Sequence, residues 1–192
     1  MIFTETKLKG AYLIHPEKIG DERGFFARVF CSDEFDAHHL NPSFVQCNIS
    51  FNALKGTIRG MHFQRPPHAE AKLVRCVKGE IFDVIIDIRP QSVSYGQWIS
   101  ARLSESNYRM LYVPEGCAHG FQTLTDNTEI FYQMSESHHP ESEGGIRPDD
   151  PDVGIPWPIQ NPSVSPRDLS YPDYFSDRKG HPSVGSLRGR NP

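Results

Sequence analysis

The sequence predicts an all-β fold, a sandwich or barrel assembled from many short strands. The 192 residues include 15 glycines and 16 prolines, so turns are frequent. Segments rich in β-branched and aromatic residues recur about every ten residues, a rhythm typical of sandwiches and barrels. Helix signals are sparse, so we expect few and short helices.

The expected strands are separated by turn signals such as Lys55-Gly56 and Glu115-Gly116. In chain order the strands are Phe25–Phe30, Phe44–Ser50, Thr57–His62, Lys72–Val77, Ile81–Ile88, Trp98–Leu103, Arg109–Val113, Phe121–Leu124 and Glu129–Met134. Lys78-Gly79-Glu80 lies between two of them and predicts a tight hairpin.

One helix is expected at Asp33–His39, because Ser32-Asp33-Glu34 has the polar character of a helix start. From Pro140 the chain is rich in Pro, Asp, Ser and Gly and loses its periodicity. Aromatic residues within 155–158 and 171–175 are expected to wrap this part onto the body. We therefore expect one domain over residues 1–176 and a flexible tail over 177–192.

Composition excludes several classes of protein. Apolar residues make up 37% and charged residues 23%, which is unlike a disordered chain, and the net charge of -4 argues against a general nucleic-acid binder. No stretch has the roughly 20 apolar residues of a membrane span, and the first residues lack a secretory signal. Cys31, Cys47, Cys76 and Cys117 form no C-x-x-C pair, so we expect reduced cysteines in a cytoplasmic protein.

The segment Ile81–Arg89 has two different faces. Phe82, Val84, Ile86 and Ile88 form an apolar face, whereas Asp83 and Asp87 alternate with Ile81 and Ile85 on the other. Either this second face looks to solvent, or the strand belongs to a barrel whose interior holds polar groups for a ligand.

Polar residues capable of chemistry gather in the middle strands. Gln46 and Asn48 share one strand face, Arg59 and His62 follow in the next strand, and Lys72 opens the one after; His119 and Tyr132 come later in the chain. A lone histidine or tyrosine in a strand is most often structural. On neighbouring strands, however, these residues together predict a basic and hydroxylic pocket.

Pro114-x-Gly116-x-x-His119 resembles half of the cupin motif. The other half of that motif supplies two histidines and a glutamate to a metal, but the matching stretch here reads His62-Phe63-Gln64. Two isolated histidines cannot close a tetrahedral metal site. We therefore expect a cupin-like barrel with neither metal nor cofactor.

A more specific resemblance covers about residues 10–175. It rests on runs that occur in this order: Asp21–Phe26, Gln46–Ser50, Gly56–Gln64, Lys72–Arg75, Gly79–Arg89, Pro114–Phe121 and Gly154–Pro158. Together they resemble the dTDP-4-dehydrorhamnose 3,5-epimerase family. The resemblance implies a metal-free, cupin-like jelly roll that forms a homodimer. It also implies epimerisation of a nucleotide-diphospho-4-keto-6-deoxyhexose at C3, at C5 or at both, through an enolate.

The resemblance implies four catalytic residues. His62 matches the base, and a neutral imidazole with a pKa of about 6.5 suits that role. Asp168 matches the carboxylate that orients the base, with Asp83 as the alternative. Lys72 matches the cation that stabilises the enolate oxygen. Tyr132 matches the acid that returns a proton on the opposite face.

Further residues match ligand contacts of the family. Arg23, Arg59 and His119 match diphosphate contacts, and arginine suits bidentate phosphate binding. Gln46, Asn48 and Glu143 match other ligand contacts, and Phe26 is expected to lie against the base of the nucleotide. In the family this site borrows residues from a partner subunit, which implies the homodimer.

Two residues depart from the family pattern at the nucleotide end. Arg28 stands where glutamate is common, and His138 stands where a tyrosine stacks on thymine. Both changes favour a nucleotide other than dTDP, and CDP is the substitute we expect. The departures leave the catalytic residues unchanged.

Three other functions remain open. A 3,4-ketoisomerase could use the same scaffold with a similar base, although His62 with Tyr132 favours epimerisation. A non-catalytic sugar-nucleotide-binding module would need the arginines but not a His62–Asp168 pair. A metal-dependent cupin oxygenase would contain bound metal.

Overall fold

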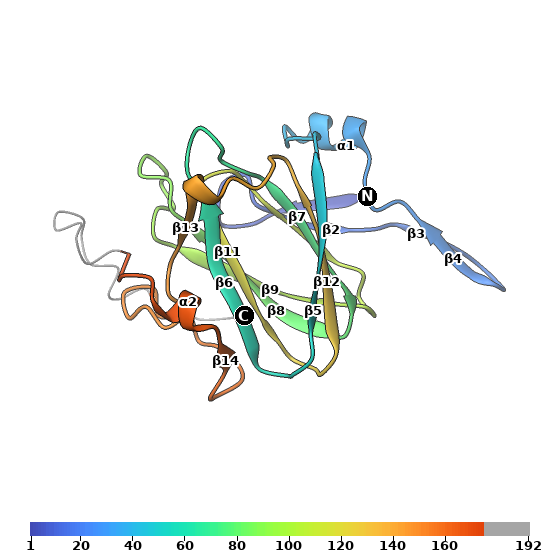
Figure 1. The fold of residues 1–192 in the computed structure, drawn as a ribbon. Helices are drawn as coiled ribbons and strands as arrows, with labels where there is room; N and C mark the ends of the chain where they lie inside the picture. The colour runs from blue at the N-terminus through green and yellow to red at the C-terminus, as the bar shows by residue number, and fades with distance from the viewer. Residues whose placement is uncertain (175–192) are drawn as a thin grey trace.

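The computed structural model describes residues 1–174, and strands dominate its regular structure (Figure 1). The strands are β1 (Ile2–Glu5), β2 (Tyr12–His15), β3 (Lys18–Asp21), β4 (Gly24–Ala27), β5 (Gln46–Asn52), β6 (Thr57–Gln64), β7 (Lys72–Lys78), β8 (Glu80–Asp87), β9 (Trp98–Ser104), β10 (Met110–Val113), β11 (Cys117–Thr123), β12 (Thr128–Met134), β13 (Glu143–Gly145) and β14 (Ser163–Val164). The helices are α1 (Ser32–Ala37), the 3-10 helix η1 (Pro140–Ser142) and α2 (Pro166–Leu169). The tail expected over residues 177–192 lies outside the described residues.

Two sheets face each other. The first sheet has the strand order β1-β2-β10-β7-β12-β5, and the second has the order β13-β6-β11-β8-β9, with β14 beside β6. All neighbours within them are antiparallel except β14 and β6. The separate β3–β4 hairpin projects from the body on the side away from α2 (Figure 1). The all-β prediction is confirmed.

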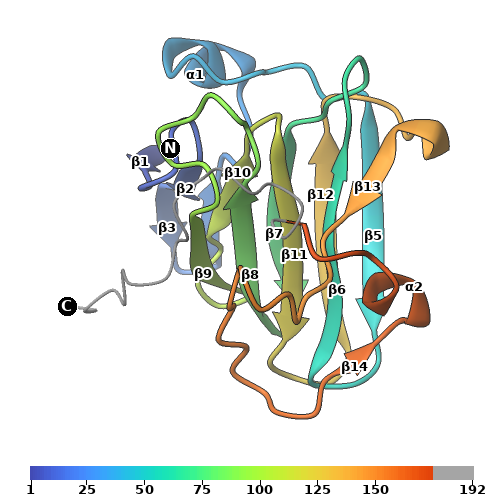
Figure 2. The same cartoon turned by 90° about the vertical axis from the view of Figure 1, so that its left-hand side faces the viewer.

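The main core lies between the sheets. Val74 and Cys76 of β7 pack there with Ile81 and Ile85 of β8 and with Phe121 of β11, and all are buried. The C-terminal segment crosses the outer face of the second sheet, as Figure 2 shows. Helix α1 and neighbouring residues cover part of the first sheet.

Strand β8 is therefore buried on both faces. Its apolar face, which includes Val84 and Ile86, packs under Trp157 of the C-terminal segment. Asp83 and Asp87 on the other face are fully buried. The alternative in which this second face looks to solvent is wrong, because the strand lies in the middle of a sandwich that is covered from outside.

The tight hairpin expected at Lys78-Gly79-Glu80 is also wrong. Strand β7 belongs to the first sheet and β8 to the second, so Gly79 turns a corner between the sheets. Its φ is +78°, and a Cβ would lie 2.4 Å from Thr125 Oγ1. A glycine turn looks the same in sequence whether the next strand pairs with the last one or leaves for another sheet.

Most other expected elements are present with shifted ends. The helix expected at Asp33–His39 is α1, and the strand expected at Phe25–Phe30 ends at Ala27. Several short elements were not predicted, namely β1, β2, β3, β13, β14, η1 and α2. All four cysteines are unpaired. Among residues 1–174, no helix is long and apolar enough to cross a membrane.

Candidate active site

Strand β6 directs Arg59 and His62 to the same face because it has one more residue than β11 between their partners. His62 lies opposite His119, whereas Arg59 lies opposite Phe121, so the register shifts by one residue between these pairs. Residues three apart in a regular strand point to opposite faces, and the bulge cancels that alternation. Gly60 lies at the shift with a φ of +114°, and a Cβ there would come within 2.6 Å of the β11 backbone.

A carboxylate from the C-terminal segment meets His62. His62 Nε2 lies 2.7 Å from Oδ1 of the buried Asp168. Ser165 caps α2, and its hydroxyl accepts a hydrogen bond from the Asp168 N–H at 3.0 Å. Burial alone would raise the pKa of Asp168, but hydrogen bonds from His62 and the Gly60 N–H outweigh burial and hold that pKa below its usual value. Asp168 is thus an anion that orients the imidazole and leaves the other ring nitrogen available.

His119 has a carboxylate of its own. Its Nε2 lies 2.8 Å from Asp83 Oδ1, and both side chains are buried. Burial raises the pKa of Asp83, although the adjacent His119 opposes that shift. Of the two carboxylates considered for His62, the structure therefore pairs Asp168 with His62 and Asp83 with His119.

Tyr132 faces these histidines from the opposite sheet. It lies on the interior face of β12, and its ring centroid is 6.3 Å from that of His119. Burial raises the pKa of Tyr132, and a hydrogen bond with Ser50 opposes that shift only in part. The phenol therefore stays protonated at any working pH. An imidazole and a phenol border the same interior from opposite sides.

Lys72 brings a cation to the same interior. Its Nζ lies 2.9 Å from Glu70 Oε1 and 3.5 Å from the backbone oxygen of His62. Both Lys72 and Glu70 are buried, and the second carboxylate oxygen of Glu70 has no hydrogen-bond partner among the described residues. The carboxylate balances the charge of the ammonium, which a buried cation requires.

Polar residues of β5 continue the site toward one edge of the first sheet. Asn52 Oδ1 accepts a hydrogen bond from Arg59 Nε at 2.7 Å, which fixes the guanidinium plane. Asn48 lies on the same strand face, and Gln46 Oε1 accepts a hydrogen bond from the His138 N–H at 3.1 Å. Gln46, Asn48, Arg59 and His138 therefore adjoin one edge, and Gln46 and Asn48 share the strand face that was expected for them.

Several residues of this site were not predicted. Arg167 pairs with the predicted Glu143, and a depression between β6 and residues 163–168 is lined by Arg59, His62 and Arg167. Tyr171 lies edge-on to His62 with ring centroids 6.3 Å apart. Arg167 adjoins Asp168 in sequence and could have been found from it. The aromatic character of residues 171–175 predicted packing for Tyr171 but no place in the site, and no sequence signal marks Glu70 or Asn52.

The predicted residues Arg23, Phe26 and Arg28 do not reach His62 within one chain. Arg23 and Phe26 belong to the projecting hairpin, and the side chain of Phe26 is 72% exposed (Figure 1). Arg23 pairs with Asp21 of the same hairpin, and Arg28 pairs with Glu34 of α1.

The chain is similar to known proteins both in sequence and in structure. The sequence model of the family described as dTDP-4-dehydrorhamnose 3,5-epimerase matches residues 5–175. The chain belongs to this family. A relative of that name from Methanothermobacter thermautotrophicus is 46% identical over 158 residues, 82% of this chain and 84% of the relative.

A crystal structure of such an enzyme from Bacillus anthracis, with TDP and pyrophosphate bound, has a TM-score of 0.86 and 39% identity. The match covers 89% of this chain and 98% of the other. A dTDP-4-dehydrorhamnose 3-epimerase from Streptomyces niveus is 38% identical over 84% of this chain and 78% of its own length. The predicted cupin-like jelly roll and sugar-epimerase activity are thereby confirmed.

Proposed function

We propose that the chain epimerises a nucleotide-diphospho-4-keto-6-deoxyhexose with His62 as the base and Tyr132 as the acid. The C–H bonds at C3 and C5 flank the C4 ketone, which stabilises the enolate formed when either proton leaves. Inversion requires that a proton leave one face of the ring and return to the other. The observation that carries this proposal is that His62 and Tyr132 come from opposite sheets and border one interior.

The charged neighbours have separate proposed roles. Asp168 orients His62 and stabilises the imidazolium after proton transfer, as carboxylates paired with histidines do elsewhere. Lys72 stabilises the enolate oxygen in a site with little water, an effect often worth a few kcal/mol. Neither role requires a metal or an organic cofactor.

Arg59 and His119 are the proposed diphosphate contacts. Asn52 binds Arg59 through Nε, which leaves the two terminal guanidinium nitrogens for a bidentate phosphate contact. Gln46, Asn48, Glu143 and His138 adjoin the same region and are the proposed contacts to the rest of the nucleotide. The names of the relatives support dTDP as the nucleotide, whereas Arg28 and His138 are the reason to test CDP beside it.

A homodimer is the proposed assembly. The hairpin exposes Ile19 at 73% and Phe26 at 72%, and the outer face of β5 exposes Ile49 and Phe51. Clustered apolar side chains of this size on a surface mark an interaction site. We propose that a second copy covers β5 and that the hairpin brings Arg23, Phe26 and Arg28 to the partner's nucleotide site.

The unpaired cysteines suit a reducing compartment such as the cytoplasm.

Solvent exchange tests the reaction directly. The protein is incubated in deuterated buffer with dTDP- or CDP-linked 4-keto-6-deoxyglucose generated in situ, and loss of the C3 and C5 proton signals is followed by NMR. Exchange at both carbons establishes a 3,5-epimerase, and exchange at C3 alone a 3-epimerase. His62→Asn should abolish exchange and retain binding. Binding of both sugars by the wild-type protein without exchange at either carbon would refute the proposal.

A further inference from the structure

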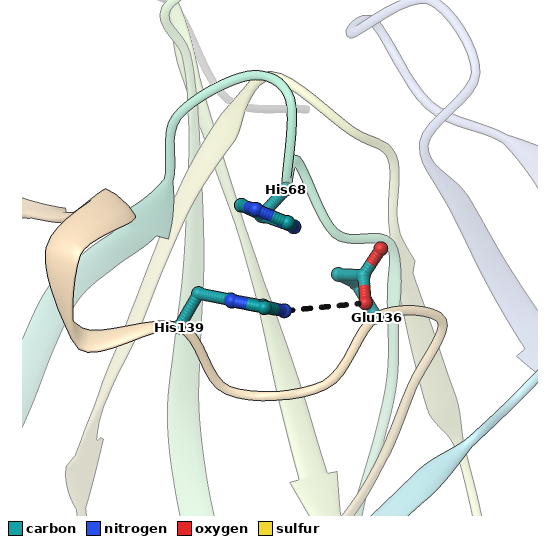
Figure 3. A group of neighbouring side chains, drawn as sticks. All are labelled: His68, Glu136 and His139. Carbon is teal, nitrogen blue, oxygen red and sulfur yellow. Dashed lines mark ion pairs between the residues drawn. The ribbon is translucent and has the colours of Figure 1, made fainter.

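Three side chains capable of binding a metal meet at one end of the barrel (Figure 3). His68 lies in the β6–β7 loop, whereas Glu136 and His139 lie between β12 and η1. One ligand atom from each residue lies within 4.8 Å of the other two, and all three residues are half-buried. Figure 3 shows the Glu136 carboxylate beside the two imidazoles. None of the three belongs to the epimerase site described above.

One buried amide fixes the backbone of both loops. Gln64 Nε2 donates to the backbone oxygens of His68 at 3.0 Å and Ser137 at 3.1 Å. Its Oε1 accepts a hydrogen bond from the His139 N–H at 2.6 Å. Gln64 is 4% exposed. The cluster therefore rests on a preorganised frame, which lowers the entropy cost of ordering ligands around an ion.

The hydrogen bond between His139 and Glu141 leaves a lone pair on His139 Nε2, the ring nitrogen that faces Glu136. His139 Nδ1 lies 3.1 Å from Glu141 Oε1, and an imidazole that donates from Nδ1 presents Nε2 as an acceptor. Nε2 lies 3.8 Å from Glu136 Oε1, which is beyond hydrogen-bond distance. Two ligands on one tetrahedral Zn²⁺ stand about 3.3 Å apart for bonds of about 2.0–2.1 Å. Glu136 Oε1 also accepts the Ser137 N–H at 2.8 Å, and the separation of Nε2 from Oε1 leaves room for both atoms to bind one ion.

We propose that His68, Glu136 and His139 bind a divalent cation of the Zn²⁺ class, with solvent in the remaining position. Two imidazoles and one carboxylate form a ligand set that Zn²⁺ takes, and Glu141 is the carboxylate that orients a ligating histidine. The rings of His68 and His139 are stacked with centroids 3.5 Å apart and planes 12° apart. On binding, the two rings rotate about their Cβ–Cγ bonds so that they are no longer parallel. The hydrogen bonds of Gln64 hold the backbone of both loops in place.

The site is structural. An ion there ties the β6–β7 loop to the segment that carries His138, whose N–H is bonded to Gln46. It thereby stiffens one rim of the barrel without contact to the reacting sugar. Because a ligand that binds the folded state stabilises it, Zn²⁺ should raise the thermal unfolding midpoint in a concentration-dependent way.

Calorimetric titration of chelator-treated full-length protein with ZnCl₂ tests the inference. We expect saturable binding of about one ion per chain. His139→Ala should abolish the binding, and Glu141→Gln should weaken it about 10–100-fold. Circular dichroism verifies that each variant is folded.

His62→Asn is the matched control, because His62 and His119 also lie side by side but belong to the proposed active site. Zn²⁺ binding and the thermal shift should survive this substitution. Binding that is lost in His62→Asn and kept in His139→Ala would overturn the inference, and so would the absence of saturable binding to the wild-type protein. Both readouts are independent of epimerase activity.

Discussion

Each of the two interior histidines has a carboxylate partner, and the partners distinguish them. His62 is one-third exposed at the side chain and is held by Asp168, whereas His119 and Asp83 are both buried. A base needs access to its substrate as well as a partner that stabilises its charged form. Exposure therefore favours His62 over His119 as the base, although both are histidines with an aspartate at hydrogen-bond distance.

Tyr132→Phe should separate exchange from inversion. Without the phenol, His62 can still remove a proton and return it to the same face, so solvent exchange continues. Formation of inverted product should fall about 10²–10⁴-fold, the usual contribution of a general acid. Proton NMR in deuterated buffer measures both rates.

Tyr112→Phe is the control for loss of a buried hydroxyl, because Tyr112 lies in the outer cluster with Leu73 and binds the Asn41 N–H. It should leave exchange and inversion near wild-type rates. Inversion by Tyr132→Phe at the wild-type rate would show that another group returns the proton.

At the scale of elements, the segment 163–174 completes a site that the strands leave open. Gly145 of β13 lies opposite His62, and Tyr171 packs directly on Gly145. A Cβ on Gly145 would lie 2.1 Å from the Tyr171 ring. Because Gly145 has no side chain, the segment that carries Asp168 and Tyr171 can pack directly against β13.

Gly145→Ala should push Tyr171 and α2 away from His62. We expect a loss of about 1–3 kcal/mol of stability from overpacking, and a fall in kcat of at least about tenfold because Asp168 shifts. In the Tyr171→Ala background the same substitution should cost far less, because the clash is gone. Equal losses in both backgrounds, measured by urea unfolding and turnover, would contradict this account.

The buried carboxylate of Asp87 stabilises the connection between β8 and β9. Asp87 accepts hydrogen bonds from Arg89, Ser92 and Ser94. Burial would raise the pKa of Asp87, but these donors outweigh it and lower that pKa to about 2. Because the folded pKa lies below the unfolded value of about 3.9, Asp87 stabilises the fold above about pH 4, and this stabilisation is lost as the pH falls toward 2.

Urea unfolding between pH 5 and pH 2 should show this loss, which amounts to about 2 kcal/mol for Asp87. Asp87→Asn should remove that part of the pH dependence and cost about 1–3 kcal/mol at neutral pH, since it removes a buried charged acceptor from Ser92, Ser94 and the partly exposed Arg89. An unchanged pH dependence in Asp87→Asn would assign the acid sensitivity to other carboxylates.

Alternation and turn signals were enough to locate the strands from β5 through β12, but the strand expected at Phe121–Leu124 left out the part of β11 that carries His119. The same signals could not tell a hairpin from a corner at Gly79, because the choice depends on which sheet accepts the next strand. The partnership of Asp168 with His62 spans 106 residues. Only family resemblance anticipated it, since residues 140–174 lack periodicity. The aromatic side chain of Tyr171 predicted packing but not contact with His62, and Glu70 carries no local signal, because both positions follow from tertiary packing.

At the scale of the whole molecule, the residues expected to bind the ligand lie in two separate places within residues 1–174. Arg23 lies on a hairpin that points away from the two sheets, while Arg59 lies on β6 of the second sheet (Figure 1). If the hairpin serves the partner's site, a damaged hairpin and a damaged base belong to different active sites of the dimer.

A heterodimer of Arg23→Glu and His62→Asn chains should therefore be active although each homodimer is not. One of its two sites combines an intact hairpin with an intact base, so about half of the wild-type rate per dimer is expected. Co-expression with two affinity tags isolates the heterodimer, and turnover is compared with both parent homodimers. A heterodimer no more active than its parents would mean that the hairpin serves its own chain or neither.

Because the proposed base and acid stand on facing sheets, the gap between them is the thickness of the sandwich. Facing sheets lie about 10 Å apart, and the side chains between them set that spacing. The buried side chains of Val74, Ile85 and Phe121 therefore help to set the distance between the proposed base and the proposed acid. Substitutions that change the volume of the core can therefore alter the distance between the base and the acid during evolution, while every residue that contacts the substrate stays the same.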